Sequence, residues 1–351
     1  MRALPDPLRL GILGCANIAR QFARDVAPSR LVRIDAVGSR DAAKARAFAA
    51  DFGIARAHAG YDALLDDDAL DAVYIPLPNS LHAQWTMRAA QRGRHVLCEK
   101  PLAMSLAEAR SMFDAARRHG VLLLEAYPWW FQPQTGTLLE LLGALGTVRS
   151  VQACFGFTLR DPAGTNIRSS AALGGGALMD AGCYPLSLIR LAMGRAPQRV
   201  QASARMAPSG VDVATAATLH YDDGAVAQMT CAMDAVLHRH ASIVGSAGVI
   251  HTEFLNHTSK PGPHPWGYLP SQLRVRRGGI GAFEAPDSPV GSGFRFAAEA
   301  FATVVAAHDS AAIERAAQAS LDIAATLDAI VASARSGETV AVSPTDAPEA
   351  L

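Results

Sequence analysis

The chain has 351 residues, of which 50% are hydrophobic and 18% are charged. This composition is typical of a globular protein and excludes an intrinsically disordered one. Basic and acidic residues balance at 32 each, and no basic block occurs, which argues against nucleic acid or an anionic membrane as the main partner. The length suits two domains of ordinary size.

The five cysteines are scattered and form no CxxC pair, which is typical of reduced thiols in a cytoplasmic protein. The stretch LGILGC around Cys15 resembles a lipoprotein cleavage box, but its apolar core covers only residues 10–13. A secretory signal needs roughly 7 to 15 apolar residues, and a membrane helix needs about 20. We therefore expect a cytoplasmic protein with no membrane partner.

Short apolar strands alternate with helices over the first third of the chain. The strands are predicted at residues 8–14, 31–39, 71–78, 95–101 and 121–127, and the helices at residues 16–27, 41–53, 80–93 and 105–120. This alternation, at about 25 to 30 residues per unit, predicts an α/β fold with a doubly wound parallel sheet. We place this Rossmann domain at residues 1–126.

After residue 126 the pattern changes to strands with period-two alternation and hairpin turns such as DDG at 222–224. Strand segments are predicted at residues 148–159, 198–206, 217–231 and 238–254, with a helix from residue 176 and two closing helices at 294–309 and 314–337. We expect an α+β domain at residues 127–351 with a large, mostly antiparallel open sheet. The closing helices, at about 294–335, are candidates to pack back on the first domain.

The stretch GCANIA at residues 14–19 follows the first strand and occupies the place of the dinucleotide fingerprint GxGxxG. Alanine at the third glycine position costs little, whereas the second glycine lies where the backbone approaches the pyrophosphate. A strand before it and a helix after it favour phosphate binding on helix amides. An ordinary tight turn of a flavodoxin-like domain is the alternative. The dinucleotide-binding residues predicted here are Gly11, Gly14, Ala16, Asn17 and Ile18.

The second strand ends at Ser39 and Arg40. A carboxylate at this point would bind the ribose hydroxyls of NAD, whereas a hydroxyl followed by an arginine suits the 2′-phosphate of NADP. Asp41 stands beside them as a possible N-cap, and Arg40 could also be a solvated residue at the start of the next helix. We favour NADP as the cofactor, with NAD as the alternative.

Three further stretches follow in order: IPLPNSLH at 75–82, CEKPLA at 98–103 and GGGALMDAGCYP at 174–185. With these motifs and spacings the chain resembles the glucose–fructose oxidoreductase, inositol dehydrogenase and rhizopine-catabolism (Gfo/Idh/MocA) family over essentially its whole length. The last stretch is similar to the branch of dimeric dihydrodiol dehydrogenases and NADP-dependent aldose (xylose) 1-dehydrogenases. The resemblance implies an NAD(P)-dependent oxidoreductase that acts on CH–OH groups.

Lys100, Asp180 and Tyr184 are the predicted catalytic residues. Lys100 ends the fourth strand, at the sheet edge where open α/β folds bind ligands, and the resemblance implies a cis bond to Pro101. A phenol with a pKa near 10 is a poor base, so Tyr184 needs a cation, which Lys100 could supply while it binds the substrate oxygen. Asp180, one helical turn earlier, can accept from a substrate hydroxyl or from Lys100. A helix cap and a packed tyrosine are the alternative for this pair.

The resemblance implies further cofactor contacts. They are Pro76, Leu77, Asn79 and His82 in the segment under the cofactor, Glu99 beside the nicotinamide ribose, and Arg168 by the nicotinamide carboxamide or the substrate. His82 is equally suited to hold its loop by hydrogen bonds. Arg168 could instead be a salt-bridged loop residue.

Trp130 stands where many members of the family carry an arginine, and Trp129 precedes it. Adjacent tryptophans indicate an apolar or sugar-stacking wall, so both are candidates for substrate binding, together with Asn166. Core packing explains at least one tryptophan equally well. The histidines lack a spacing typical of metal ligands, so we expect no metal.

We predict hydride transfer between nicotinamide and a carbinol of a cyclic polyol, most simply the C1 hydroxyl of an aldose. The alternatives are a trans-dihydrodiol dehydrogenase, a dicarbonyl-sugar reductase, a glycosidase that uses NAD for transient oxidation, and a non-catalytic cofactor sensor. The open sheet should carry helices on one face only. Its other face would then be apolar and covered by a second subunit, which predicts a homodimer or a homotetramer.

Overall fold

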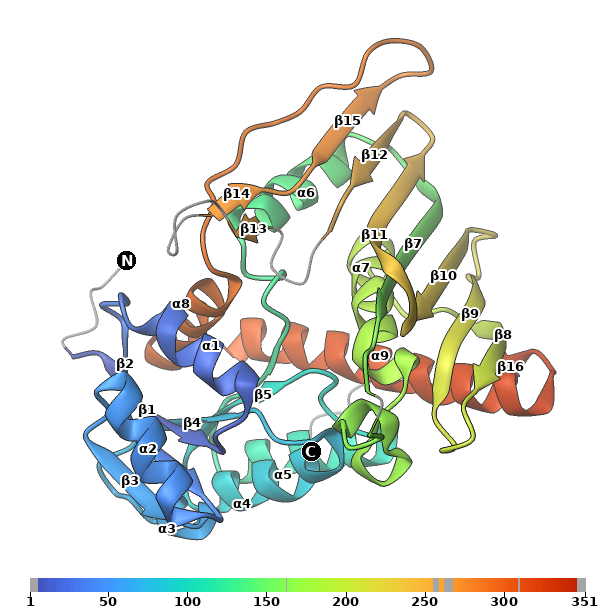
Figure 1. Cartoon of the computed structure of the whole chain (residues 1–351). Coiled ribbons are helices and arrows are strands. Elements are labelled where there is room, and N and C mark those ends of the chain that lie inside the picture. The colour runs from blue at the N-terminus through green and yellow to red at the C-terminus, as the bar shows by residue number, and fades with distance from the viewer. Residues whose placement is uncertain (1–5, 162, 255–258, 262–267, 309, 346–351) are drawn as a thin grey trace. The chain divides into compact units, whose positions relative to one another are not determined.

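The computed structural model describes residues 6–161, 163–254, 259–261, 268–308 and 310–345. The chain forms two compact units, one of Met1–Pro128 with Phe294–Ala317 and the other of Trp129–Gly293 with Gln318–Leu351. Each unit has its own sheet and is described by itself (Figure 1). In the part of the chain that the structure describes, no helix is both long enough and apolar enough to span a bilayer.

The first unit contains a six-stranded parallel sheet in the order β3-β2-β1-β4-β5-β6, which confirms the predicted doubly wound fold. The strands are β1 Leu8–Leu13, β2 Val32–Ser39, β3 Arg56–Ala59, β4 Ala72–Ile75, β5 His95–Glu99 and β6 Leu123–Ala126. The helices are α1 Asn17–Val26, α2 Ala42–Phe52, α3 Tyr61–Leu65, η1 Asn79–Leu81, α4 His82–Gln91, α5 Leu106–Arg118 and, from its second residue, α8 Gly293–Ala307. The edge strand β3 was not predicted, because its sequence RAHA has no β-branched residue and alternates between half-buried and exposed positions.

The strand order of the first unit reverses at β1, which lies between β2 and β4. Right-handed crossovers place α1 and α2 on one face of the sheet and α4 and α5 on the other (Figure 1). Phe22 of α1 stacks on Tyr74 of β4 with ring centroids 3.8 Å apart, and both side chains are fully buried. The carboxyl ends of β1, β2, β4 and β5 therefore share one edge, where doubly wound sheets bind their ligands.

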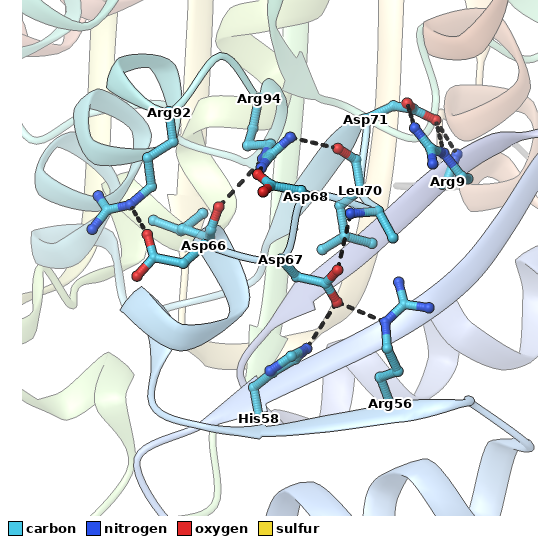
Figure 2. A network of polar contacts seen from close by, with 12 residues as sticks. Arg9, Arg56, His58, Asp66, Asp67, Asp68, Leu70, Asp71, Arg92 and Arg94 are labelled. Carbon is cyan, nitrogen blue, oxygen red and sulfur yellow. Dashed lines mark hydrogen bonds and ion pairs between the residues drawn. The ribbon is translucent and has the colours of Figure 1, made fainter.

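Ion pairs and hydrogen bonds between charged residues connect the segments at the opposite edge of this sheet, where β1 and β4 begin (Figure 2). Asp67, in the loop before β4, accepts hydrogen bonds from Nε of Arg56 at 2.6 Å and pairs with Nε2 of His58 at 2.9 Å. Asp71 pairs with Arg9 of β1 at 2.5 Å. These contacts fix the entry into β4, away from the ligand-binding edge.

The second unit contains an eight-stranded sheet in the order β15-β12-β11-β7-β10-β9-β8-β16. The strands are β7 Val148–Thr158, β8 Arg199–Met206, β9 Asp212–His220, β10 Val226–Ala232, β11 Asp234–Gly245, β12 Gly248–Thr252, β15 Leu273–Arg277 and β16 Val340–Ala341, with a separate pair of β13 Ser259–Pro261 and β14 Tyr268–Pro270. The helices are α6 Pro133–Gly143, η2 Ile167–Ser169, η3 Ala171–Leu173, η4 Leu178–Gly182, α7 Cys183–Met193 and, from Gln318, α9 Ser310–Ser336. Among the described strands of this sheet, only β7 and β10 pair in parallel, so the prediction of a mostly antiparallel sheet is confirmed.

The helix α7 packs against β7 and β10 and covers one face of this sheet. The other face carries mostly polar side chains: Gln152 and Gln228 are hydrogen-bonded at 3.3 Å, and Sγ of Cys154 lies 3.1 Å from Nδ1 of His240. The expectation of an apolar outer face is therefore wrong for most of it, because Gln, Thr, Ser and His alternate with the inward-facing apolar residues. Exposed large apolar side chains do occur on β11, at Val236, Leu237 and Val244.

Candidate active site

The turn after β1 is shaped for a close approach of the backbone. Gly14 has φ +109°, and its N–H donates to the carbonyl of Gly38 at 2.8 Å. A Cβ on Gly14 would lie 3.0 Å from Cδ2 of Leu77, so both conformation and space favour glycine. Ala16 then forms the N-cap of α1 without a side-chain capping bond, which leaves the first-turn amides of the helix, from Asn17 onward, to an anion. These features fit a dinucleotide pyrophosphate.

Gly11 has a packing role. It lies inside β1 and is buried, and a Cβ at this position would come 2.7 Å from Cδ1 of Leu70. The absence of a side chain makes room for core packing beneath the sheet edge. This packing role accounts for the glycine by itself, and the contact of Gly11 with the cofactor stays a prediction.

The end of β2 presents Ser39, which is buried, and Arg40, which is exposed. The carboxylate of Asp41 caps α2, with its Oδ1 accepting from the N–H groups of Ala43 and Lys44 at 2.9 and 3.1 Å. Asp41 is thus explained as a cap, and the guanidinium of Arg40, a residue with an exposed surface, is in hydrogen-bond contact with the side chain of Tyr61. In a Rossmann fold this position adjoins the adenosine ribose.

His82 holds two loops together. It is fully buried, and its Nδ1 and Nε2 lie 3.0 and 2.8 Å from the carbonyl oxygens of Pro101 and Leu77. Burial lowers the pKa of His82 although these hydrogen bonds oppose the shift. Both ring nitrogens face carbonyl groups of the protein, which fits the loop-holding alternative, and a contact of His82 with the cofactor stays a prediction. Pro76, Leu77 and Asn79 lie in the loop that His82 holds, and Asn79 begins η1.

Lys100 follows β5 and is half-buried, and its peptide bond to Pro101 is cis, as the family resemblance implies. Two buried carboxylates hold the backbone around it. Oε2 of Glu99 accepts from the N–H of Lys100 at 3.4 Å, while Oε1 of Glu125 accepts from the N–H of Leu102 at 2.9 Å. Glu99 also accepts a hydrogen bond of 2.5 Å from the hydroxyl of Tyr74. Sequence analysis did not identify Glu125, since it lies inside a strand.

In the second unit, consecutive glycines let a loop approach the start of a helix. A Cβ on Gly175 would lie 2.4 Å from the carbonyl oxygen of Arg168, and one on Gly176 would lie 2.2 Å from Oδ1 of Asp212. The N–H of Gly176, with φ +112°, donates to that Arg168 carbonyl at 2.9 Å. The glycines thereby bring the backbone of Arg168 to the helix that carries Asp180.

Asp212 of β9 caps this helix. Its Oδ2 accepts from the N–H of Leu178 at 2.8 Å and from the hydroxyl of Thr215 at 2.7 Å. The helix begins as a π-helical turn, η4, a widened form often found at functional sites, and continues as α7. Asp180 therefore lies inside the widened turn and is not the helix cap. Asp212 was not identified from the sequence because it lies on a distant strand.

Arg168, Asp180 and Tyr184 are brought together at this turn. Nε of Arg168 donates to Oδ2 of Asp180 at 2.6 Å. Burial opposes the charged form of Arg168, but attraction and hydrogen bonding to Asp180 raise its pKa, and the charge of Tyr184 acts in the same direction. Tyr184 is only 6% exposed, and its ring lies 5.4 Å from that of Phe155. Asn166 supports the group, since its Oδ1 accepts from the N–H of Arg168 at 3.0 Å.

The two tryptophans, predicted either to pack in the core or to bind substrate, differ in their burial. Trp129 has no exposed surface, and its Nε1 donates to Oγ of Ser187 at 3.1 Å. It belongs to the core of the second unit, which fits the core-packing alternative, and a contact of Trp129 with the substrate stays a prediction. Trp130 is half-buried and packs edge-on against Trp129, with ring centroids 6.2 Å apart.

His82 generates a prediction about stability. The neutral imidazole of His82 carries one N–H, so His82→Leu removes one hydrogen bond to a buried carbonyl group, and we expect the free energy of unfolding to fall by about 1–3 kcal/mol at pH 8. The folded pKa of His82 is lowered, so the unfolded chain binds its proton first and the wild type loses stability as the pH falls below about 6.5. The leucine variant lacks this loss. The difference in free energy of unfolding between wild type and variant, measured by urea unfolding, should therefore become smaller from pH 8 to pH 5. His119→Leu, at an exposed position, is the control. A difference in free energy of unfolding between wild type and His82→Leu that does not change with pH would contradict the prediction.

Two protein-family models match long parts of this chain. The model of the GFO/IDH/MocA oxidoreductase family, described as an NAD-binding Rossmann fold, matches residues 8–127, and the GFO/IDH/MocA C-terminal domain matches residues 141–251.

Individual relatives are similar over almost their entire length. D-xylose 1-dehydrogenase (NADP(+)) 2 of Haloferax volcanii is 37% identical over 335 residues, which are 95% of this chain and 99% of that protein. The aldose–aldose oxidoreductase of Caulobacter crescentus, solved with glycerol, superposes with a TM-score of 0.84 at 29% identity, covering 95% and 99% of the two chains. KijD10, a 3-ketoreductase from Actinomadura kijaniata solved with NADP and TDP-benzene, gives 0.81 at 31% identity, covering 93% and 98%. The chain therefore belongs to the GFO/IDH/MocA family of oxidoreductases, and its first domain is the NAD-binding Rossmann fold of that family.

Proposed function

We propose that the protein is an NADP-preferring dehydrogenase that oxidises the C1 hydroxyl of an aldose in pyranose form. The observation that carries this proposal is the setting of Tyr184, a nearly buried phenol beside the Arg168–Asp180 ion pair. An acid/base tyrosine requires such a site, because charged neighbours decide whether the phenol can give up its proton. The similarity to a xylose 1-dehydrogenase and to an aldose–aldose oxidoreductase supports an aldose as the substrate.

The proposed chemistry divides the work among three side chains. When bound, the cofactor supplies the acceptor for the hydride on C1 of the sugar. Tyr184 takes the proton of the C1 hydroxyl, so that the oxygen forms the carbonyl of a lactone. Lys100 binds the same substrate oxygen, and its positive charge favours the phenolate. Asp180, held by Arg168, accepts a hydrogen bond from a neighbouring sugar hydroxyl.

The acid/base role predicts the effect of Tyr184→Phe. We expect reduced-nicotinamide absorbance to appear with NADP and an aldose such as D-xylose, and kcat to fall by about 100- to 10,000-fold in the variant. Tyr221→Phe is the matched control, because the buried Tyr221 hydroxyl has no hydrogen-bond partner among the described residues. The control should keep its kcat.

The same assay separates the alternatives when the panel includes a trans-dihydrodiol and a dicarbonyl sugar. Turnover of either of these in preference to every aldose would replace the proposed substrate. Cofactor binding without any net change in absorbance would overturn the dehydrogenase proposal. It would favour a glycosidase with transient oxidation or a cofactor sensor.

Arg40 is the proposed determinant of the cofactor. Arg40→Ala should raise the KM for NADP about 10- to 100-fold, because a guanidinium–phosphate contact contributes about 1.5–3 kcal/mol. The KM for NAD should not change, since NAD has no 2′-phosphate. Steady-state kinetics with both cofactors measures the difference, with the exposed Arg46→Ala of α2 as the control. An equal loss with NADP and NAD would assign Arg40 to folding instead.

We also propose that the enzyme is a homodimer at least, with β11 in the interface. Val236, Leu237 and Val244 are 80%, 64% and 40% exposed on this strand, on the sheet that α7 covers from one face. Leu237→Glu should therefore shift the sedimentation coefficient towards the monomer value, because burial of a charge in an interface is unfavourable. Leu139→Glu, on the helix α6, should not. A monomeric wild type at micromolar concentration would contradict this proposal.

A further inference from the structure

Arg239 lies on β11 directly opposite Phe155 of β7. Its guanidinium carbon is 4.5 Å from the centroid of the Phe155 ring, within the range of a cation–π contact. Phe155 also contacts Tyr184, with ring centroids 5.4 Å apart and an interplanar angle of 49°, and Phe157, with ring centroids 6.0 Å apart. Arg239, Phe155 and Tyr184 therefore form a continuous series of side-chain contacts from the sheet to the start of α7.

Charged residues of the second unit that interact with Tyr184 or with its partners include Arg168, Asp180 and Arg239, in addition to the Lys100 proposed above. Asp180 of η4 and Arg168 of η2 form an ion pair at 2.6 Å, and Arg239 comes from β11. Strand β7, which packs directly on α7, contributes the uncharged Phe155 ring at this point, while the uncharged Cys231 thiol of β10 lies near Gly182, two residues before Tyr184. Because Asp180 opposes the charge of Arg168, this pair affects the phenol less than an arginine alone would.

The electrostatics of Arg239 link it to the same tyrosine. Burial lowers the pKa of Arg239, and the negative charge of an ionised Tyr184 opposes that shift. An attraction between two groups acts equally on both, so a charged Arg239 must in turn favour the phenolate.

We propose that Arg239 is a positioning residue for Tyr184, which holds Phe155 against the phenol ring and supplies positive charge that favours the phenolate. This inference rests on the proposed acid/base role of Tyr184 and extends it to a residue outside the recognised motifs. A neutral residue at position 239 leaves the ring contact weaker and the phenolate less stable. The tyrosine then gives up its proton only at higher pH.

The test is a titration of Tyr184 itself. The near-ultraviolet absorbance of tyrosinate is followed against pH, and subtraction of the matching curve for the same protein with Tyr184→Phe isolates Tyr184. Arg239→Met should move its midpoint up by about one pH unit, as expected for loss of one partly buried charge. The pH profile of kcat/KM should move by the same amount.

Two variants separate charge from structure. Arg239→Lys keeps the charge and should hold the midpoint near that of the wild type. Arg276→Met is the matched control, since Arg276 makes a similar contact, 5.0 Å from the Phe283 ring, on β15 of the same sheet, and it should leave Tyr184 unchanged.

The outcomes distinguish this inference from the proposed function. An unchanged Tyr184 midpoint in Arg239→Met overturns the role of Arg239, whatever the turnover. The same upward shift in Arg239→Lys also overturns it, because charge is then not the cause. A shift restricted to the methionine variant supports it. If that shift occurs while no protein in the series oxidises any substrate, the proposed function fails and the electrostatic link between Arg239 and Tyr184 stands.

Discussion

The candidate site of the second unit depends on a close approach of two backbone segments at Gly175 and Gly176. With no side chains there, the Arg168 carbonyl accepts from the N–H of Gly176, and Asp212 reaches the helix start. A Cβ on Gly175 would lie too close to the Arg168 carbonyl oxygen, and a Cβ on Gly176 too close to Oδ1 of the Asp212 carboxylate. Because Gly175 and Gly176 have no Cβ, the Arg168 segment can approach the helix start. This approach allows the ion pair of Arg168 and Asp180 to form.

A comparable constraint operates in the first unit, where His82 joins the loops after β4 and β5. One buried ring lies within hydrogen-bond distance of both the Leu77 and the Pro101 carbonyl oxygens, and its N–H satisfies a group that would otherwise be costly to bury. The loop after β5 carries Lys100, so a histidine that need not touch the ligand still positions a residue that we assign to the substrate. Such indirect roles explain why a motif can contain residues with no chemical function of their own.

The environment of Tyr184 shows how a site can combine an apolar wall with charge. Phe155 and α7 exclude water from the phenol, which by itself would favour the neutral form. The positive charges of Arg168, which is partly balanced by Asp180, and of Arg239, which lies on the Phe155 ring, are the groups that we propose act against this tendency. Burial and charge oppose each other at the phenol, and the balance between them determines how readily Tyr184 ionises.

The sequence by itself determined the features that depend on neighbouring residues. Apolar periodicity located five strands and four helices of the first unit, and the motifs identified Gly14, the cis Lys100–Pro101 bond and the helix of Tyr184. The short edge strand β3 gave no signal, because half-exposed residues do not need an apolar pattern.

Only the tertiary structure decided the roles that depend on contacts between distant segments. In the structure Asp212 caps the helix, Trp129 lies buried in the core, and Gly11 lies where a side chain would collide with core residues. It also placed Arg239 over Phe155, which follows from the pairing register of β7 and β11. Side-chain spacing along one strand shows which face a residue occupies, but the partner it meets across the sheet is set by long-range pairing that no local pattern encodes.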